Sequence, residues 1–219
     1  MKKQRLSQKA YEQIKDMIIN NRLKPGEIIN EAGMQELLGI GRTPIREAFQ
    51  ELARDQLVTI HPRKGIEISH ISPKKIHDIF ELRELLEPSV LAKGMQNIDR
   101  EWLAKMRQEF LDTAGRRLTK QPGGILECVR LDDEFHNTLI SCIGNQYALE
   151  IMNSFLDYLT MIRIATTSDE QRYNASNLEH VGIIDAILNN DVKGACAKLK
   201  KHIEISHQAT IENFIHSSY

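Results

Sequence analysis

Apolar residues in the first part of the chain recur in short periodic segments separated by turn residues, and this pattern predicts three helices. Helical spacing runs through residues 6–18, and Pro25-Gly26 ends that segment because proline cannot continue a helix and glycine permits the turn. A second short helix is expected to start near Asn30 and to close at Gly39-Ile40-Gly41. A third begins around Thr43-Pro44, where the missing N–H of proline is tolerated in a first helical turn.

Two alternating apolar stretches follow the third helix and predict a β-hairpin. They cover residues 57–60 and 66–69, with His61-Pro62-Arg63-Lys64-Gly65 between them as the hairpin tip. The buried stripe of the third helix is expected at Ile45, Ala48, Phe49 and Leu52. The order helix, helix, helix, hairpin is that of a winged helix-turn-helix.

From Ser72-Pro73 onward the pattern is helical throughout. The serine caps a new helix and the proline occupies its first turn, which places a domain boundary near residue 71. Six helical segments and no strand follow, several of them about 20 residues long, which suits an antiparallel bundle. We therefore expect a mainly α protein, with a winged helix-turn-helix domain at residues 1–71 and an all-helical domain at residues 72–219.

Composition is that of an ordinary globular protein, with 41% hydrophobic and 27% charged residues. No apolar run approaches the ~18–20 residues that span a bilayer, so we expect no membrane segment, and nothing at the N-terminus predicts a signal peptide. The three cysteines lie far apart without a C-x-x-C pair, which favours a reducing cytoplasm. The net charge of −1 combines +3 in residues 1–70 with −4 in the remainder, an asymmetry that chance explains as well as an anionic partner does.

Polar residues on the third helix are typical of a surface that reads DNA. Arg42 and Arg46 lie four apart near the helix start with Thr43 beside them, and Gln50 and Arg54 continue the face of Arg46. Recognition helices place their N-terminal residues against the major groove, where arginine can give two hydrogen bonds to guanine. A threonine hydroxyl and the first-turn N–H groups suit a phosphate. The alternative is a small helical domain whose arginines are merely solvated.

The hairpin tip adds a second set of candidate DNA contacts. His61, Arg63 and Lys64 are placed to approach a phosphate or the minor groove, and Gly65 allows close contact. Because the turn, the arginine pair and the basic tip converge, the pattern favours a double-stranded DNA operator as the partner.

The N-terminal segment resembles the GntR family of regulators. Gly41-Arg42-Thr43-Pro44-Ile45-Arg46-Glu47-Ala48 is similar to the recognition-helix signature of that family. Leu23-Lys24-Pro25-Gly26 and Arg63-Lys64-Gly65 fall where the family has its P-G turn and wing glycine. Two positions depart from the pattern. Many relatives carry serine at the position of Gly41, and some carry a basic residue near Ala32, so this chain lacks a hydroxyl at the first position and a positive charge at the second.

The second half offers an independent constellation of metal-binding side chains. Asp132 and His136 lie four apart on one otherwise apolar helix face, and His180 and His202 lie in the apolar stripes of two later helices. A single inward histidine is more often a hydrogen-bonded core residue. Four such groups on three inward faces instead favour one shared cation, and a carboxylate with three imidazoles suits zinc, nickel or manganese.

The same half resembles the FCD ligand-binding domain, which defines the FadR subfamily of GntR regulators. The likeness covers nearly all of residues 73–219, and six helices resemble the VanR-like branch. Its motifs are Glu84-Leu85-Leu86-Glu87-Pro88, Leu131-Asp132-Asp133-Glu134-Phe135-His136, Glu179-His180-Val181-Gly182-Ile183-Ile184-Asp185-Ala186-Ile187 and Lys201-His202. The resemblance implies that Asp132, His136, His180 and His202 are the metal ligands.

The resemblance also implies a small organic acid beside the metal. Arg83 and Arg163 are the expected cationic contacts, since each interrupts a mostly apolar segment, although a surface salt bridge explains either of them equally well. We expect a homodimer whose operator affinity changes when the acid binds. The rival hypotheses are a regulator for which the metal itself is the signal and a metal-dependent enzyme. No H-E-x-x-H motif or evident general base supports the enzyme.

Overall fold

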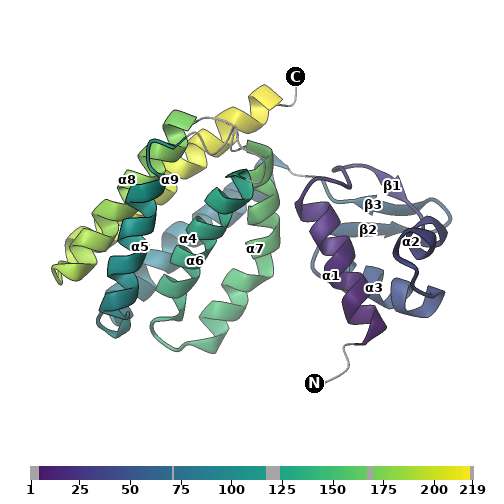
Figure 1. Ribbon diagram of the computed structural model, residues 1–219, viewed down its shortest axis with the longest axis horizontal. Coiled ribbons are helices and arrows are strands. Elements are labelled where there is room, and N and C mark those ends of the chain that lie inside the picture. The colour runs from purple at the N-terminus through teal and green to yellow at the C-terminus, as the bar shows by residue number, and fades with distance from the viewer. Residues whose placement is uncertain (1–4, 71, 117–123, 167–169, 218–219) are drawn as a thin grey trace. The chain divides into compact units, whose positions relative to one another are not determined.

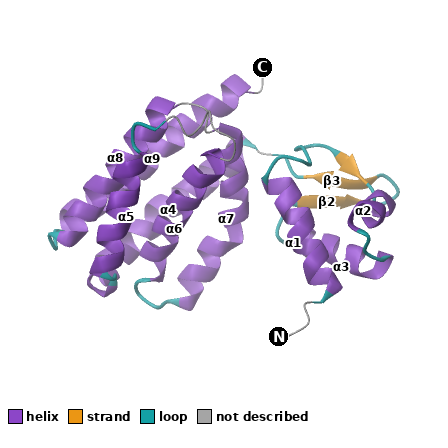
Figure 2. Cartoon of the chain, in the orientation of Figure 1, coloured by secondary structure: helices purple, strands orange, loops and turns teal. Residues whose placement is uncertain are grey.

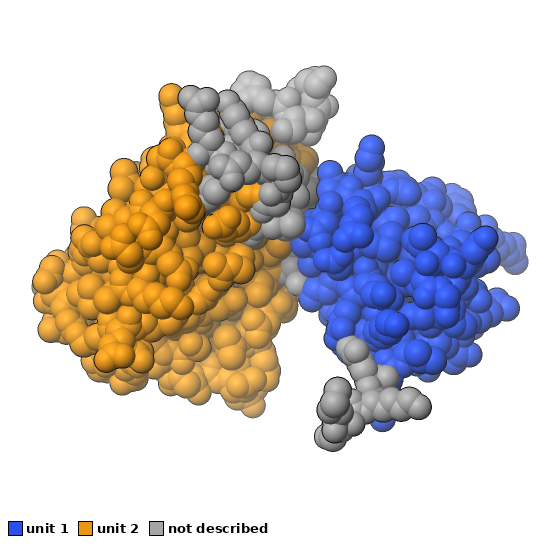
Figure 3. Space-filling view, viewed as in Figure 1, with its two compact units in different colours: residues 1–72 blue, residues 73–219 orange. Residues whose placement is uncertain are grey.

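The computed structural model describes residues 5–70, 72–116, 124–166 and 170–217. The chain divides into two compact units, residues 1–72 and residues 73–219, which Figure 3 shows in blue and orange. Each unit has its own hydrophobic core and is described separately.

The N-terminal unit is a winged helix-turn-helix with a small antiparallel sheet. Its elements are α1 (Leu6–Ile19), β1 (Ile28–Ile29), α2 (Glu31–Leu38), α3 (Arg42–Arg54), β2 (Val58–His61) and β3 (Gly65–Ile68). The three strands have the order β1-β3-β2, with Ile28 opposite Glu67 and Val58 opposite Ile68. The sequence did not reveal β1, because two residues are too few to display alternation.

Local sequence accounts for the boundaries of the two helices of the helix-turn-helix. The side chain of Asn30 accepts a hydrogen bond from the Gly33 N–H and caps α2, and Gly39 ends that helix in the left-handed conformation at φ 64°. The predicted stripe on α3 is confirmed, because Ile45, Ala48, Phe49 and Leu52 are all buried, while α1 packs against α3. The opposite face of α3 therefore remains available to a partner.

The C-terminal unit is a helical bundle, as the pattern predicts (Figures 1 and 2). In the part that the structure describes, the α-helices are α4 (Pro73–Gly94), α5 (Arg100–Thr113), α6 (Gly124–Ser141), α7 (Gln146–Thr166), α8 (Glu170–Leu188) and α9 (Val192–Ser217). A short 3-10 helix, η1 (Met95–Asn97), follows α4. Helix α9 packs against α4, α7 and α8, and α6 packs against α7 and α4, so side chains from five helices meet in one interior.

The core of this bundle is aromatic where it surrounds the inward histidines. Phe110 on α5 stacks on the His180 ring at 4.4 Å between centroids, and Phe135 on α6 meets the same ring edge-on at 4.9 Å. These contacts fix the imidazole plane before any polar partner is considered. No helix in the described ranges is long and apolar enough to cross a membrane.

Candidate functional site

Four side chains from three helices converge inside the bundle. Asp132 and His136 on α6, His180 on α8 and His202 on α9 each offer one ligand atom, and these atoms all lie within 4.8 Å of one another. The three histidines are buried and Asp132 is partly buried. The four residues that the sequence singled out as metal ligands thus lie within reach of one shared cation.

The spacing of the ligand atoms fits a small coordination sphere. His180 Nε2 lies 3.4 Å from His136 Nε2 and 3.5 Å from Asp132 Oδ1, and His136 Nε2 lies 3.8 Å from Asp132 Oδ2. In a tetrahedral zinc site, metal–nitrogen bonds of about 2.1 Å put neighbouring ligand atoms about 3.4 Å apart. These residues therefore fit a first-row divalent cation with little rearrangement.

Two glutamates orient two of the imidazoles. Glu87 Oε2 lies 2.6 Å from His136 Nδ1, and Glu179 Oε2 lies 2.7 Å from His202 Nδ1. A carboxylate only accepts hydrogen bonds, so Nδ1 carries the proton in both rings, and in the neutral imidazole Nε2 then keeps its lone pair for a metal. Sequence reasoning assigned neither glutamate a role, although both lie in segments that resemble the FCD domain.

Burial keeps two of the histidines neutral. It lowers the pKa of His180 well below 6.5, and it lowers the pKa of His202 although the hydrogen bond with Glu179 opposes the shift. The Nδ1 atom of His180 is buried and has no hydrogen-bond partner in the described residues. Neutral imidazoles are the form that binds a cation, so the site is prepared for one without further deprotonation of these two rings.

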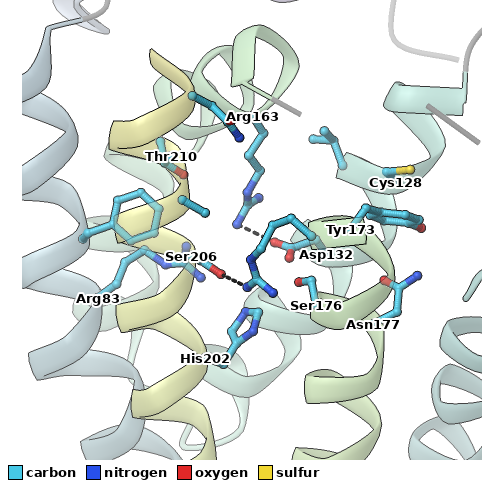
Figure 4. A pocket seen from close by; sticks show the side chains of 15 residues that line it. Arg83, Cys128, Asp132, Arg163, Tyr173, Ser176, Asn177, His202, Ser206 and Thr210 are labelled. Carbon is cyan, nitrogen blue, oxygen red and sulfur yellow. Dashed lines mark hydrogen bonds and ion pairs between the residues drawn. The ribbon is translucent and has the colours of Figure 1, made fainter. Parts of the chain in front are cut away.

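A cavity of about 100 Å³ adjoins this cluster, and three arginines line it (Figure 4). They are Arg83 on α4, Arg163 on α7 and Arg172 on α8. The sequence predicted the first two as acid-binding residues. It gave no signal for Arg172, which lies in the polar first turn of α8, where an arginine looks like a surface residue.

Each of these arginines pairs with a carboxylate that is either Asp132 itself or a glutamate hydrogen-bonded to one of the clustered histidines. Arg83 Nε lies 2.5 Å from Glu87 Oε1, and Arg163 pairs with both Asp132 and Asp133. Arg172 pairs with the two oxygens of Glu179 at 2.8 and 3.0 Å, and it donates to Ser206 Oγ at 3.0 Å. Two arginines therefore reach ligand histidines through one glutamate each, and Arg163 contacts a predicted ligand directly. The exposed salt bridge considered for Arg83 is wrong, because both members of its pair are buried.

The arginines hold the buried carboxylates in their charged form. Burial alone would raise the pKa of Glu87, but the Arg83 guanidinium and His136 outweigh it and lower the pKa to about 2. Burial acts in the same direction on Asp132, and Arg163 is the strongest opposing group, so the pKa of Asp132 falls far below its ordinary value. The Nη2 atom of Arg83 is buried without a hydrogen-bond partner in the described residues, which leaves one cationic donor unused at the cavity.

The predicted DNA-contacting residues of α3 lie on its exposed face. These residues are Arg42, Thr43, Arg46, Gln50 and Arg54. Only Arg42 has an ion pair among the described contacts of this set, a 3.6 Å approach of its Nε to Glu31 Oε2 on α2. An exposed pair of this kind is worth at most about 1 kcal/mol, so Arg42 can exchange Glu31 for a phosphate or a base.

Two residues of the hairpin tip, His61 and Gly65, make contacts within the N-terminal unit. Arg63 and Lys64 are exposed, but His61 Nε2 lies 2.6 Å from Glu67 Oε2 and is partly buried. Gly65 has φ +117°, and a Cβ placed there would lie 2.7 Å from the Ile29 carbonyl oxygen. The close approach at Gly65 is therefore to β1 within the sheet, and a DNA contact at this glycine stays a prediction.

A winged helix-turn-helix with an exposed basic recognition face, followed by a helical bundle with an internal polar site, is the architecture of a bacterial transcriptional regulator. The chain belongs to the GntR family, in the group whose C-terminal domain is an FCD domain. The model for bacterial regulatory proteins of the gntR family matches residues 6–68, and the FCD domain model matches residues 78–205.

Relatives and solved structures agree with this assignment. The chain is 27% identical over 193 residues to the HTH-type transcriptional regulator YdhC of Bacillus subtilis, covering 88% of this chain and 84% of that protein. Its fold is similar to that of E. coli McbR/YncC, with a TM-score of 0.78 at 16% identity over 97% of this chain and all of the other. The Zn2+-bound FCD domain of TM0439 aligns with a TM-score of 0.54 at 23% identity, over 67% of this chain and 98% of that domain.

Proposed function

We propose that this transcriptional regulator changes its operator affinity when a small organic acid binds beside a divalent metal in the C-terminal unit. The observation that carries the proposal is that a cluster of potential metal ligands and an arginine-lined cavity adjoin inside the same bundle. A cluster of Asp132, His136, His180 and His202 borders a cavity that three arginines line. These four residues would hold the metal, and a cation that accepts a fifth or sixth ligand would leave a place at the cavity for an acid oxygen.

The donor set and its spacing support a metal. Three imidazole nitrogens and one carboxylate suit zinc, nickel or manganese, and the separations near 3.4 Å favour a small ion. The related FCD domain of TM0439 was solved in a Zn2+-bound form. Zinc is therefore the first metal to test.

The cavity supports a compact acid with hydroxyl groups. Its volume of about 100 Å³ is smaller than the ~150 Å³ of a cavity that holds benzene, which limits the ligand to a few carbons. Ser176, Ser206 and Thr210 line it along with the arginines, as Figure 4 shows. Guanidinium groups suit the carboxylate and the lining hydroxyls suit further polar groups on the ligand.

The DNA-binding unit supplies the output of the proposed switch. Arg42, Thr43, Arg46, Gln50 and Arg54 would meet the major groove from α3, and Arg63 and Lys64 would contact the backbone from the hairpin tip. His61 would contribute only after release from Glu67, since the two are hydrogen-bonded.

A homodimer would place two such heads on a roughly palindromic operator. Exposed apolar side chains on two helices of the C-terminal unit support this assembly, since Leu85 on α4 is 67% exposed and Tyr147 on α7 is 78% exposed. Leu82 and Ile151 are further exposed apolar residues of the same two helices. Burying them against a second copy would remove apolar area from water.

Direct measurement distinguishes the proposed acid-responsive regulator from a metal-responsive regulator and from a metal-dependent enzyme. The purified protein is screened by thermal shift with small hydroxy acids, each with and without zinc, and the acids that stabilise it are added to operator-binding titrations. An acid that shifts operator affinity only with zinc present supports the proposal, and a response to zinc alone assigns the metal as the signal. Turnover of a stabilising acid would instead support an enzyme, which we do not infer because the relatives are transcriptional regulators.

Single substitutions test the two sites separately. His136→Ala should reduce bound metal in elemental analysis, whereas His77→Ala, an exposed histidine on α4, should leave it unchanged. Arg46→Ala should weaken operator binding by about 1–3 kcal/mol and relax base preference, whereas Lys64→Ala should lower affinity evenly across sequences and flatten the salt dependence. Unaltered metal content in His136→Ala would remove that residue from the ligand set.

A further inference from the structure

We propose that Arg163 and the metal compete for Asp132, and that metal binding transfers Arg163 from Asp132 to the incoming acid. The inference rests on the proposed function and assigns one residue as the link between the two ligands. Arg163 then binds Asp132 before the metal arrives and the acid afterwards.

The competition follows from which groups share the Asp132 carboxylate. Arg163 comes from α7 and forms an ion pair with Asp132 Oδ2, drawn as a dashed line in Figure 4. The same oxygen lies 3.8 Å from His136 Nε2, and Oδ1 lies 3.5 Å from His180 Nε2. A cation held by the two histidines would draw on the carboxylate that the guanidinium already occupies. It would also be repelled by that positive charge at close range.

A second carboxylate keeps Arg163 at the cavity when Asp132 turns to the metal. Asp133, the next residue on α6, pairs with Nη1 of Arg163, while Asp132 pairs with Nη2. Asp133 is itself fixed, because Thr160 Oγ1 donates to its Oδ2 at 3.1 Å. Losing Asp132 therefore frees one edge of the guanidinium without releasing the side chain from the cavity wall.

Charge balance gives the order of binding. Among the described residues, the cavity arginines and their partners comprise three cations and four carboxylates, the latter being Glu87, Asp132, Asp133 and Glu179. These seven side chains together carry one net negative charge, which disfavours an anion. A divalent cation reverses the sign to one net positive charge, which a single carboxylate neutralises. Metal binding thus prepares the cavity for the acid, and by reciprocity the acid strengthens metal binding.

The test is the zinc affinity of the full-length protein, measured by competition with a chromogenic chelator after metal removal. Arg163→Met removes the competing charge and keeps a side chain of similar length, so zinc should bind about tenfold more tightly or better, corresponding to the loss of an opposing charge close to the site. A residue that merely supported the ligands would give the opposite sign on removal. Arg130→Met is the control, because Arg130 is on the same helix as Asp132 but pairs with Glu134 at the exposed surface.

The outcomes distinguish this inference from the function on which it rests. Zinc binding that is unchanged or weaker in Arg163→Met, with unchanged affinity in the control, overturns the competition and leaves the metal site standing. A wild-type protein that binds no zinc overturns both. Where Arg163→Met does not fold, as judged by circular dichroism, Arg163→Gln replaces it, since its amide can still donate to Asp133, and the same tightening of zinc binding is required.

Discussion

The buried pair of Arg83 and Glu87 gives the sharpest stability prediction. Both side chains are almost inaccessible to solvent, at 2% and 0% exposure, and Arg83 Nε is 2.5 Å from Glu87 Oε1. Replacing Arg83 by methionine preserves much of the side-chain volume but leaves the Glu87 carboxylate buried with His136 as its remaining partner. The substitution therefore tests the cost of an unbalanced charge rather than the cost of a cavity.

Removing one partner of a buried pair typically costs about 3–5 kcal/mol, because the remaining charge loses its compensation. For a unit of this size each kcal/mol lowers the melting temperature by roughly 2–4 °C, so Arg83→Met should lower it by about 6–20 °C. Adding Glu87→Gln should recover part of the loss. The amide is neutral and its oxygen still accepts the hydrogen bond from His136 Nδ1.

The assay is thermal unfolding of the full chain, followed by circular dichroism at 222 nm with a chelator present so that no metal contributes. Arg107→Met is the matched control, since Arg107 pairs with Asp185 at 2.7 Å while both side chains are more than a third exposed. That pair should be worth less than about 1 kcal/mol. The reasoning about the buried charge is wrong if Arg83→Met melts within 2 °C of Arg107→Met. It is also wrong if adding Glu87→Gln to Arg83→Met lowers the melting temperature further.

Three further predictions concern the wing and the metal. Gly65→Ala should destabilise the N-terminal unit by about 1–3 kcal/mol in denaturant unfolding, because φ is +117° and the new Cβ meets the Ile29 carbonyl, whereas Gly41→Ala, with open space around it, should change little. The hydrogen bond with His61 lowers the pKa of Glu67 below 4.5, so its stabilising contribution is complete above pH 4.5 and is lost as the pH falls through the lower folded value. Melting temperatures from pH 6 to pH 3 should therefore converge for wild type and Glu67→Gln at the acid end, and parallel curves would contradict this. Zinc added to chelator-treated wild-type protein at a hundred times its dissociation constant should raise the free energy of unfolding by about 2.7 kcal/mol. His136→Ala should lack that gain, and an equal gain in the wild type and in the variant would place the zinc elsewhere.

Much of the fold follows from residue pattern alone. The stripe on α3, the capping residue Asn30 and the Ser72-Pro73 start of α4 are local signals, because helix periodicity and caps involve residues within one or two turns of each other. The same periodicity places Asp132 and His136 on one face of α6. It also places His180 and His202 in the apolar stripes of their helices. The sequence alone therefore predicts that all four side chains point into the bundle.

Only the tertiary structure decided which side chains share the interior with those four residues. Glu87 and Glu179 are ordinary charged residues in sequence, and their histidine partners lie 49 and 23 positions away on other helices. Arg172 pairs with Glu179 along α8, but only the packing of α9 brings it to Ser206, 34 positions away. Strand β1 was hidden for the same reason, since two residues become a strand only when β3 lies beside them. A sequence specifies the helix face on which a side chain lies. Charge pairing between helices depends on which faces pack together, and the packing is set by how the bundle buries its apolar side chains.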